Sequence, residues 1–290
     1  MNAFYALPSL DEPRVGIPPI PPSLSHPEQT TQAGHAYLWL VFAIMALSSL
    51  AFFVASQRAP YRYRLVHTTT FFITAIAALS YFAMATGVGK RLVHSPDTLH
   101  PHPREFFYAR YIDWFFTTPL LLLDLALLAG LPVAEIIVLL FVDLIMISTG
   151  IIAALHPVEL GKWGFFAFST LALVYIVAHL VTSGRRNASL RGPKVARLYN
   201  QVSVALVAVW SLYPVAFALG EATHRLSPDQ EVLFFAILDV VAKPVWGAWL
   251  LVATPEEGKV LVPESWSTPA ASPSGGGYGA IASEPRDEDA

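Results

Sequence analysis

The fold is decided by the stretch Leu238-Asp239-Val240-Val241-Ala242-Lys243-Pro244-Val245-Trp246-Gly247, which lies inside the last long apolar segment of the chain, at about residues 229–254. Ionisable residues in the middle of a membrane-length apolar run are costly and are functional candidates by default. Asp239 and Lys243 are four residues apart, so in a helix they lie on one face, one turn from each other. Two interpretations follow. The pair is either a structural ion pair, or Lys243 is a desolvated amine that forms a Schiff base with a carbonyl compound beside a carboxylate.

The composition is that of an integral, multi-pass membrane protein. Of the 290 residues, 54% are hydrophobic and 13% are charged, whereas a soluble domain carries about 25% charged residues. The chain has no cysteine, which excludes disulfides, thiolate metal sites and cysteine nucleophiles. A basic patch interleaved with aromatic residues is also missing, so we do not expect a nucleic-acid partner.

Seven segments are long and apolar enough to span a membrane, since a span needs about 20 mostly apolar residues. They lie at about residues 35–57, 64–86, 105–128, 133–155, 161–183, 196–221 and 229–254. The sequence therefore predicts an all-α membrane protein with a seven-helix bundle over residues 34–254. The proline-rich residues 1–33 and the Pro-, Ser- and Gly-rich, acidic residues 255–290 are predicted to be disordered tails.

Basic residues predict the orientation of the bundle. They concentrate around two connections on the same side of the membrane, which carry Arg58, Arg62 and Arg64, and Arg185, Arg186, Arg191, Lys194 and Arg197. The positive-inside rule places these connections in the cytoplasm. We therefore expect an extracellular N-terminal tail and a cytoplasmic C-terminal tail, with the plasma membrane as the expected location.

The third segment carries three ionisable residues, Arg110, Asp113 and Asp124. Asp113 and Asp124 are eleven residues apart, so they share a helix face at a separation of about 16 Å. Such a polar line suits a proton or ion path. In the alternative, Arg110 and Asp113 form a structural pair and Asp124 reaches the membrane surface.

Three further features have mainly structural interpretations. Asp143 in the fourth segment is expected to bond a neighbouring helix, through Thr118. The aromatic residues of the sixth segment fall at helical spacing around a proline, which is typical of packing. The connection at residues 87–104 contains His94, His100 and His102 among prolines, and we expect these histidines to be solvated, with no metal bound.

Taken together, the motifs resemble the microbial (type I) rhodopsins, and most closely the fungal branch of the bacteriorhodopsin-like proton pumps. The resemblance spans about residues 35–254 and rests on Arg110-Tyr111-x-Asp113-Trp114, Thr117-Thr118-Pro119 with Asp124, Trp210-x-x-Tyr213-Pro214, and Leu238-Asp239-x-x-Ala242-Lys243.

The resemblance implies a cofactor, all-trans retinal, bound to Lys243 as a protonated Schiff base. It implies that Asp113 is the primary counterion and proton acceptor, Asp124 the proton donor and Asp239 the second counterion. It also implies that Arg110 and Tyr81 order the polar network, and that Glu231 is a candidate release group. The implied retinal-binding residues are Tyr81, Trp114, Thr118, Leu121, Met146, Gly150, Phe166, Ser169, Thr170, Trp210, Tyr213, Pro214, Phe217, Ala242 and Lys243.

Two departures from the family pattern lead to further expectations. Pro244 directly follows the lysine and cannot donate a hydrogen bond to the carbonyl of Val240, so we expect a kink or bulge there. Glu221 falls only near the position of the second member of the family's glutamate pair, which argues against early proton release through that pair.

The implied function is a light-driven outward proton pump, an ion transporter and not an enzyme, with protons and membrane lipid as its partners. The alternative is a slow-cycling light sensor of the same fold with a cytoplasmic signalling partner. A carboxylic residue at position 124 favours the pump, and a homo-oligomer is left open. A rhodopsin-related folding factor is disfavoured by the presence of Lys243, and a chloride pump by the acidic residue at position 113.

Overall fold

The computed structural model of the protein describes residues 27–93 and 102–255. In chain order its elements are α1 (Gln32–Arg58), the 3-10 turn η2 (Tyr61–Tyr63), α2 (Arg64–Ala85), β1 (Arg91–Val93), β2 (Arg104–Phe106), α3 (Tyr108–Ala129), α4 (Val133–Leu155), α5 (Glu159–His179), the π-helical turn η3 (Leu180–Gly184), α6 (Arg185–Leu190), α7 (Pro193–Trp210), α8 (Leu212–Phe217), the π-helical turn η4 (Ala218–Ala222), α9 (Pro228–Val240), the π-helical turn η5 (Val241–Val245) and α10 (Trp246–Ala253).

Within these residues, seven helical runs are long and apolar enough to cross a membrane, which confirms the predicted seven-helix architecture. They are Gln32–Arg58, Arg64–Ala85, Tyr108–Ala129, Val133–Leu155, Glu159–Leu190, Pro193–Ala222 and Pro228–Ala253. Large apolar side chains such as Leu47 and Val252 point outward. Outward apolar side chains suit a lipid environment and would be unfavourable in water, so the chain is an integral, multi-pass membrane protein.

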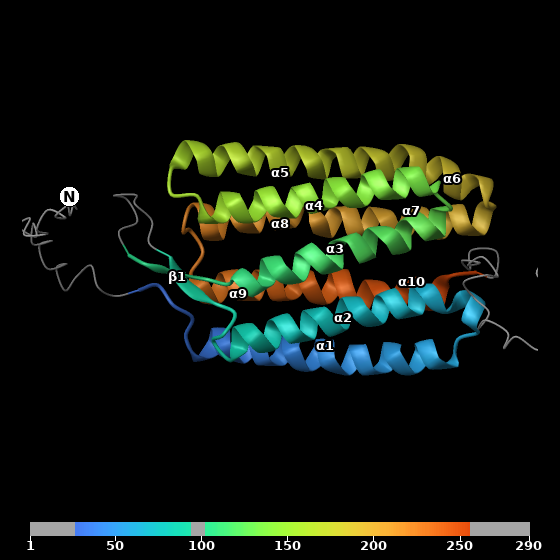
Figure 1. Ribbon diagram of the computed structural model, residues 1–290. Helices are drawn as coiled ribbons and strands as arrows, with labels where there is room; N and C mark the ends of the chain where they lie inside the picture. The colour runs from blue at the N-terminus through green and yellow to red at the C-terminus, as the bar shows by residue number, and fades with distance from the viewer. Residues whose placement is uncertain (1–26, 94–101, 256–290) are drawn as a thin grey trace, which may run out of the picture.

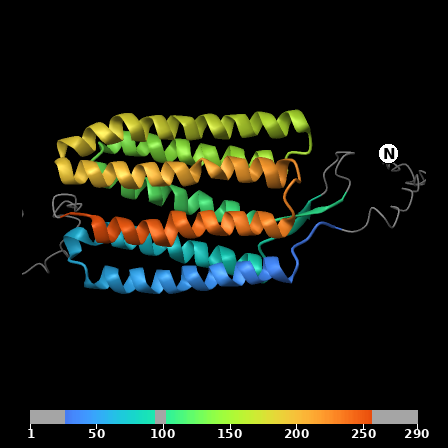
Figure 2. The same ribbon diagram turned by 180° about the vertical axis from the view of Figure 1, so that it is seen from behind.

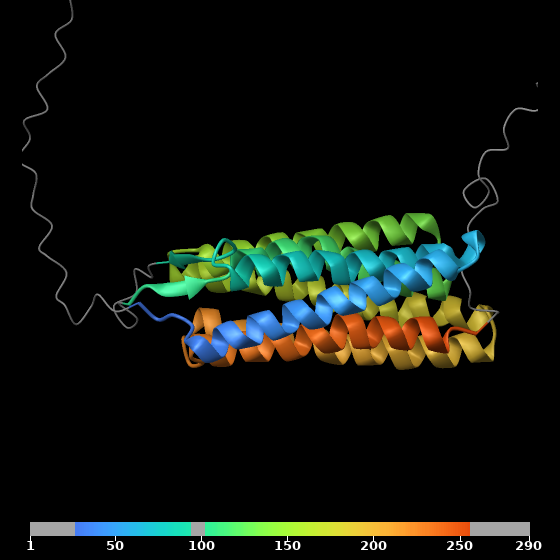
Figure 3. The same ribbon diagram turned by 90° about the horizontal axis from the view of Figure 1, so that it is seen from below.

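The helices run side by side as one bundle, with the short strands β1 and β2 at one end (Figure 1). That end is called the hairpin end below. The reverse view shows the run of α9, η5 and α10 next to α7 and α8 (Figure 2), and the view from below shows α1 crossing obliquely beside α2 and α10 (Figure 3). Helix α3 lies inside the bundle, and many of its side chains are buried.

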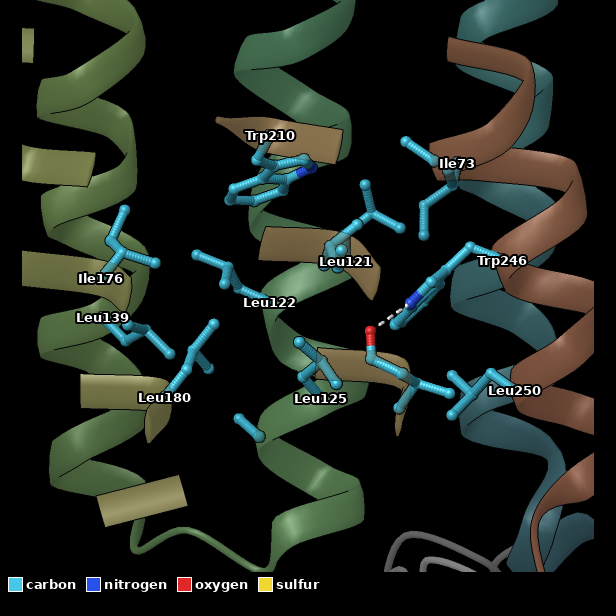
Figure 4. Close-up of a cluster of buried hydrophobic side chains, with 14 of the residues drawn as sticks. Ile73, Leu121, Leu122, Leu125, Leu139, Ile176, Leu180, Trp210, Trp246 and Leu250 are labelled. Atoms are coloured by element: carbon cyan, nitrogen blue, oxygen red, sulfur yellow. Dashed lines mark hydrogen bonds between the residues drawn. The ribbon is translucent and has the colours of Figure 1, made fainter. Parts of the chain in front are cut away.

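The largest apolar core joins side chains of α2, α3, α4, α5, α7 and α10 (Figure 4). Leu121, Leu122 and Leu125 of α3 meet Trp210 of α7 and Trp246 of α10 there. The indole N–H of Trp246 donates a hydrogen bond of 2.9 Å to the carbonyl of Val202 in α7. This bond satisfies a buried polar group that would otherwise be costly.

Pro244 produces the bulge that the sequence predicted. Since proline has no N–H, the backbone widens into the π-helical turn η5, and the N–H of Trp246 reaches the carbonyl of Val241, five residues earlier. The turn contains Lys243, so the distortion occurs at the centre of the bundle.

The hairpin end contains structure that the sequence did not predict. Strand β1 pairs antiparallel with β2, with Arg91 opposite Phe106, and for this reason the third span begins as a helix only at Tyr108 and not at residue 105. Glu28 forms a parallel bridge with Arg104. Residues 27–31, expected to belong to a disordered tail, are therefore ordered, while residues 1–26 and 256–290 fall outside the described part of the chain.

The fifth span is longer than predicted. It continues through η3 into α6 and ends at Leu190, so Arg185 and Arg186 lie in a helix and not in a loop. Within the π-helical turn, the carbonyl of Leu180 accepts the backbone N–H of Arg185, five residues later, and a hydrogen bond of 2.9 Å from the hydroxyl of Tyr199. Gly184 makes room for this contact, because a Cβ there would lie 1.9 Å from that hydroxyl.

Candidate functional site

Lys243 is buried at the centre of the bundle between two carboxylates. Its Nζ donates to Oδ2 of Asp113 in α3 and, at 3.0 Å, to Oδ1 of Asp239 in α9. The second contact is the ion pair across one helical turn that the spacing of the two residues predicted. All three side chains are almost completely shielded. Buried charges are tolerated when they are paired and hydrogen-bonded, and this group has one cation for two anions.

Asp239 is held by several donors besides the lysine. The hydroxyl of Tyr81 donates to Oδ2 at 2.7 Å, and the hydroxyl of Tyr213 donates to Oδ1 at 2.8 Å. The indole N–H of Trp114 lies 3.4 Å from Oδ1. Hydrogen bonds of this kind stabilise the charged form of a carboxylate, so Asp239 is built as a fixed anion.

Asp113 has fewer partners than Asp239. Its Oδ2 accepts from Lys243, while its Oδ1 has no hydrogen-bond partner among the described residues. The hydroxyl of Thr117 donates to the backbone carbonyl of Asp113 at 2.8 Å. A carboxylate with a free oxygen next to the amine is the better placed of the two to take a proton.

An apolar cavity leads to Lys243. A mostly apolar wall with a few polar groups is typical of small-molecule sites. The cavity is lined by Tyr111, Trp114, Thr118, Leu121, Met146, Ile147, Gly150, Phe166, Ser169, Thr170, Leu173, Trp210, Tyr213, Pro214, Phe217, Ala242 and Lys243.

All of the implied retinal-binding residues except Tyr81 line the cavity. The hydroxyl of Tyr81 contacts Asp239 instead. Tyr111, Ile147 and Leu173 also line it and were missed. Leu173 lies three residues after Thr170 on the same helix face, so helical spacing could have indicated it.

Phe166 and Phe217 close part of the cavity wall as a stacked pair. Their ring centroids are 5.1 Å apart, and the ring planes differ by 12°. Two parallel rings present a flat apolar surface to the cavity.

Asp124 lies on the side of Lys243 that faces away from the hairpin end. It is completely buried, and its carboxylate accepts a hydrogen bond from the hydroxyl of Thr69 in α2. No cation pairs with it among the described residues. Leu121 comes between Asp113 and Asp124 in the sequence of α3, and it belongs with Trp246 to the buried apolar core (Figure 4).

Arg110 does not form the pair with Asp113 that the sequence left open. Its Nη1 lies 3.2 Å from Oε1 of Glu231 and 3.3 Å from Oε1 of Glu221. The hydroxyl of Tyr111 also donates to Glu221. Glu221 is therefore part of this network, contrary to its expected offset, because the π-helical turn η4 changes the helix face on which it lies.

Asp143 has the structural contact that the sequence predicted. The hydroxyl of Thr118 donates to its Oδ2 at 2.7 Å. The described residues contain no cluster of three or more potential ligands for a metal ion. His94 and His100 of the histidine-rich connection lie outside those residues.

Comparison with known proteins places this architecture in a family. The sequence matches the family described as bacteriorhodopsin-like protein over residues 32–256. The chain belongs to the bacteriorhodopsin-like family. The rhodopsin is 37% identical to Opsin-1 of Neurospora crassa over 267 residues, which cover 87% of each chain. It is 42% identical to the opsin-like protein carO of Fusarium fujikuroi over 229 residues, which cover 76% of this chain and 73% of that protein. These relatives support a fungal type I rhodopsin, a class of light-driven transporters and not of enzymes.

Solved structures agree with this assignment. The rhodopsin resembles the light-driven proton pump LR (Mac) from Leptosphaeria maculans, with a TM-score of 0.75, 39% identity and coverage of 80% of this chain and 98% of that one. It also resembles the light-driven proton pump of Coccomyxa subellipsoidea, with a TM-score of 0.75, 36% identity and coverage of 78% and 99%.

Proposed function

We propose that this rhodopsin is a light-driven outward proton pump. The observation that carries the proposal is the position of Lys243, whose amine lies between Asp113 toward the hairpin end and Asp124 toward the opposite end. A proton-carrying nitrogen between two buried carboxyl groups can take a proton from one side and pass it to the other. The similarity to two solved proton pumps supports the same function.

The cavity suits retinal as the cofactor. Its wall is mostly apolar and aromatic, and Lys243 is its only lysine. A long apolar aldehyde would be held by these side chains and joined to the lysine Nζ as a protonated Schiff base, with Asp113 and Asp239 as counterions. When bound, all-trans retinal supplies the absorption of visible light and the isomerisation that changes the surroundings of the Nζ proton.

The residues around the lysine support Asp113 as the acceptor of the first proton transfer. Its Oδ2 already accepts from Nζ, and its Oδ1 has no described partner. Asp239 is fixed as an anion by two tyrosine hydroxyls, so we propose it as the second counterion. The Nζ–H bond breaks, and an O–H bond forms on Asp113, closer to the hairpin end.

Asp124 then restores the proton on the lysine nitrogen. It is buried in an apolar region and its carboxyl group contacts Thr69 and no described cation, which suits a group that carries a proton in the resting state. The apolar core between Asp124 and Lys243 keeps water out until this step. The two transfers move one proton toward the hairpin end in each cycle.

Orientation in the membrane decides whether this transport is outward. The basic residues around the opposite end, such as Arg58, Arg64 and Lys194, support a cytoplasmic location for that end by the positive-inside rule. The hairpin end is then extracellular, and the plasma membrane is the proposed location.

The test is the light-induced pH change of a suspension of cells that express the protein and receive all-trans retinal. Green light should acidify the medium, and a protonophore should abolish the signal. Alkalinisation would reverse the proposed orientation or direction. A visibly coloured sample without a pH change would overturn the pump and support the slow-cycling sensor.

A further inference from the structure

A chain of alternating charges connects the interior of the bundle to the ordered N-terminal segment at residues 27–31. It begins with Glu221 and Glu231, which share the guanidinium of Arg110. It continues through Arg104 of strand β2, whose Nη2 lies 2.9 Å from Oε2 of Glu231 and whose Nη1 pairs with Glu28. The side chain of Glu28 is 34% exposed. The other four, those of Glu221, Arg110, Glu231 and Arg104, are buried.

This group of five side chains contains more carboxyl groups than guanidiniums. Three carboxyl groups face two guanidiniums, and arginine keeps its proton in proteins. Two guanidiniums therefore serve three carboxyl groups, and the carboxyl group with the fewest cationic contacts is the place where a proton is held most easily. Glu231 contacts both arginines, whereas Glu221 contacts one arginine and the hydroxyl of Tyr111. The proton of this group consequently belongs on Glu221, with Glu231 as its ionised partner.

Arg104 is placed to control this balance. Its guanidinium divides its hydrogen bonds between Glu28, Glu231 and the backbone carbonyl of Leu226. An arginine that is shared between two carboxylates stabilises each one less than an arginine that serves one alone. The charge on Glu28 thus weakens the hold of Arg104 on Glu231.

We infer that Arg104 and Glu28 are positioning residues that set when a proton leaves the Glu221–Glu231 pair, and that residues 27–31 are part of the proton exit. The inference rests on the proposed pump. In the release step an O–H bond of the glutamate pair breaks and the proton passes to water at the hairpin end. Both arginines remain charged.

The surroundings of the chain are consistent with an exit. A second, polar cavity adjoins it and is lined in part by Arg104, Glu105, Glu221, His156, Lys162 and His224. The charged groups that face Glu28 are Arg104 and, at 3.6 Å, Nδ1 of His224. Glu105 is occupied separately by Lys90 and by the backbone and hydroxyl of Thr30.

The contacts of Glu28 and Arg104 also hold the N-terminal segment in place, which is a structural effect distinct from their charge. The N-terminal segment is also attached through Thr31, whose N–H and hydroxyl donate to Asp229 at 2.9 Å and 2.6 Å. Thr31→Val weakens this attachment without changing any charge. It is therefore the control for loosening of the segment alone.

The experiment uses the purified full chain with all-trans retinal and a soluble pH-indicator dye. After a flash, the appearance of protons in bulk solution is timed against loss of the proton from Lys243 Nζ, which is followed by absorption. Arg104→Gln removes one of the two cations of Glu231, so the pair holds its proton longer and release is delayed by roughly tenfold, the size expected for losing one hydrogen bond to a charged group. Arg104→Lys keeps a positive charge at this position, so proton release should be delayed less than in Arg104→Gln.

Glu28→Gln should act in the opposite direction and bring release forward by about threefold, because Arg104 then serves Glu231 more fully. Thr31→Val should lower the thermal stability of the coloured protein and leave the timing unchanged. The inference would be overturned if Arg104→Gln and Glu28→Gln changed the time of proton release in the same direction, or if neither changed it. Sustained acidification by illuminated cells is measured in parallel. Acidification together with an unchanged time of proton release would reject only this inference. A lack of acidification would reject the proposed pump.

Discussion

Asp113 and Asp239 contact the same Nζ atom of Lys243 but differ in how many other donors hold them. Asp239 accepts from the hydroxyls of Tyr81 and Tyr213, whereas Oδ1 of Asp113 has no partner among the described residues. Proton transfer favours the acceptor whose anionic form is stabilised less. The difference between the two carboxylates therefore supports the proposal that Asp239 is the fixed counterion and Asp113 the proton acceptor.

Asp113→Asn should stop sustained pumping and shift the absorption maximum to longer wavelength. The amide cannot accept the proton, and the loss of one anion beside Lys243 weakens the stabilisation of its positive charge. The measurements are the absorption spectrum and light-induced acidification. Asp143→Asn is the matched control, since this buried carboxyl group bonds Thr118 and does not contact the lysine. Unchanged transport in Asp113→Asn would reject Asp113 as acceptor.

Lys243→Ala should abolish the visible colour of the protein after addition of all-trans retinal. Among the residues that the structure describes, no other lysine lines the cavity, so these residues offer no substitute site for covalent attachment. The control is Lys162→Ala, which removes a buried lysine that pairs with Glu159 at the hairpin end and should leave the colour intact. Colour that persists in Lys243→Ala would contradict the attachment site.

Asp124→Asn should slow the return of the proton to Lys243 Nζ by roughly a hundredfold or more, the usual contribution of a positioned proton donor. The slowed step should depend on the pH of the medium, and azide should partly restore it by carrying protons. Flash photolysis measures this step. Thr69→Val removes the hydroxyl that donates to Asp124 and should have a smaller effect. An unaltered rate in Asp124→Asn would exclude the donor role.

Trp246→Phe should destabilise the folded protein by about 1 kcal/mol, the net value of one hydrogen bond. The change keeps an aromatic ring in the core but leaves the carbonyl of Val202 without its indole partner. Trp249→Phe is the control, because Trp249 lies on the same helix and faces outward. Its effect should stay within about 0.5 kcal/mol. Thermal loss of colour compares the two variants, and equal effects would show that the hydrogen bond contributes nothing.

Acidification should loosen the hairpin end through Glu105. Burial alone would raise the pKa of this carboxyl group, but hydrogen bonds from Lys90 and Thr30 lower it below the usual 4.5. A depressed folded-state pKa contributes stability that is complete above the unfolded-state pKa and is lost as the pH falls through the lower, folded-state value. Hydrogen exchange of residues 27–31 and β2 should therefore quicken below about pH 4.5, and Glu105→Gln should remove this pH dependence. Exchange that quickens equally in the variant would assign the effect to other groups.

Local patterns in the sequence were sufficient to predict the seven-helix architecture and the lysine–aspartate pair at the centre of the site. The length of each apolar run predicted seven spans, because the thickness of the membrane sets the length of a helix that crosses it. The spacing of Asp239 and Lys243 predicted their ion pair, because the helix places residues four apart on one face. Pro244 predicted the distortion beside the lysine, because it lacks the N–H that a regular helix requires.

The tertiary structure alone decided the network at the hairpin end. Arg110 lies 111 and 121 residues from Glu221 and Glu231 in sequence, and Arg104 lies 76 residues from Glu28. A π-helical turn sets the face of Glu221, and an unpredicted hairpin carries Arg104 to Glu231. Helical spacing relates residues one or two turns apart, whereas contacts between distant segments depend on how the helices pack and how their connections fold back. The sequence by itself therefore determined the spans and the lysine–aspartate pair, and packing decided which charges meet at the hairpin end.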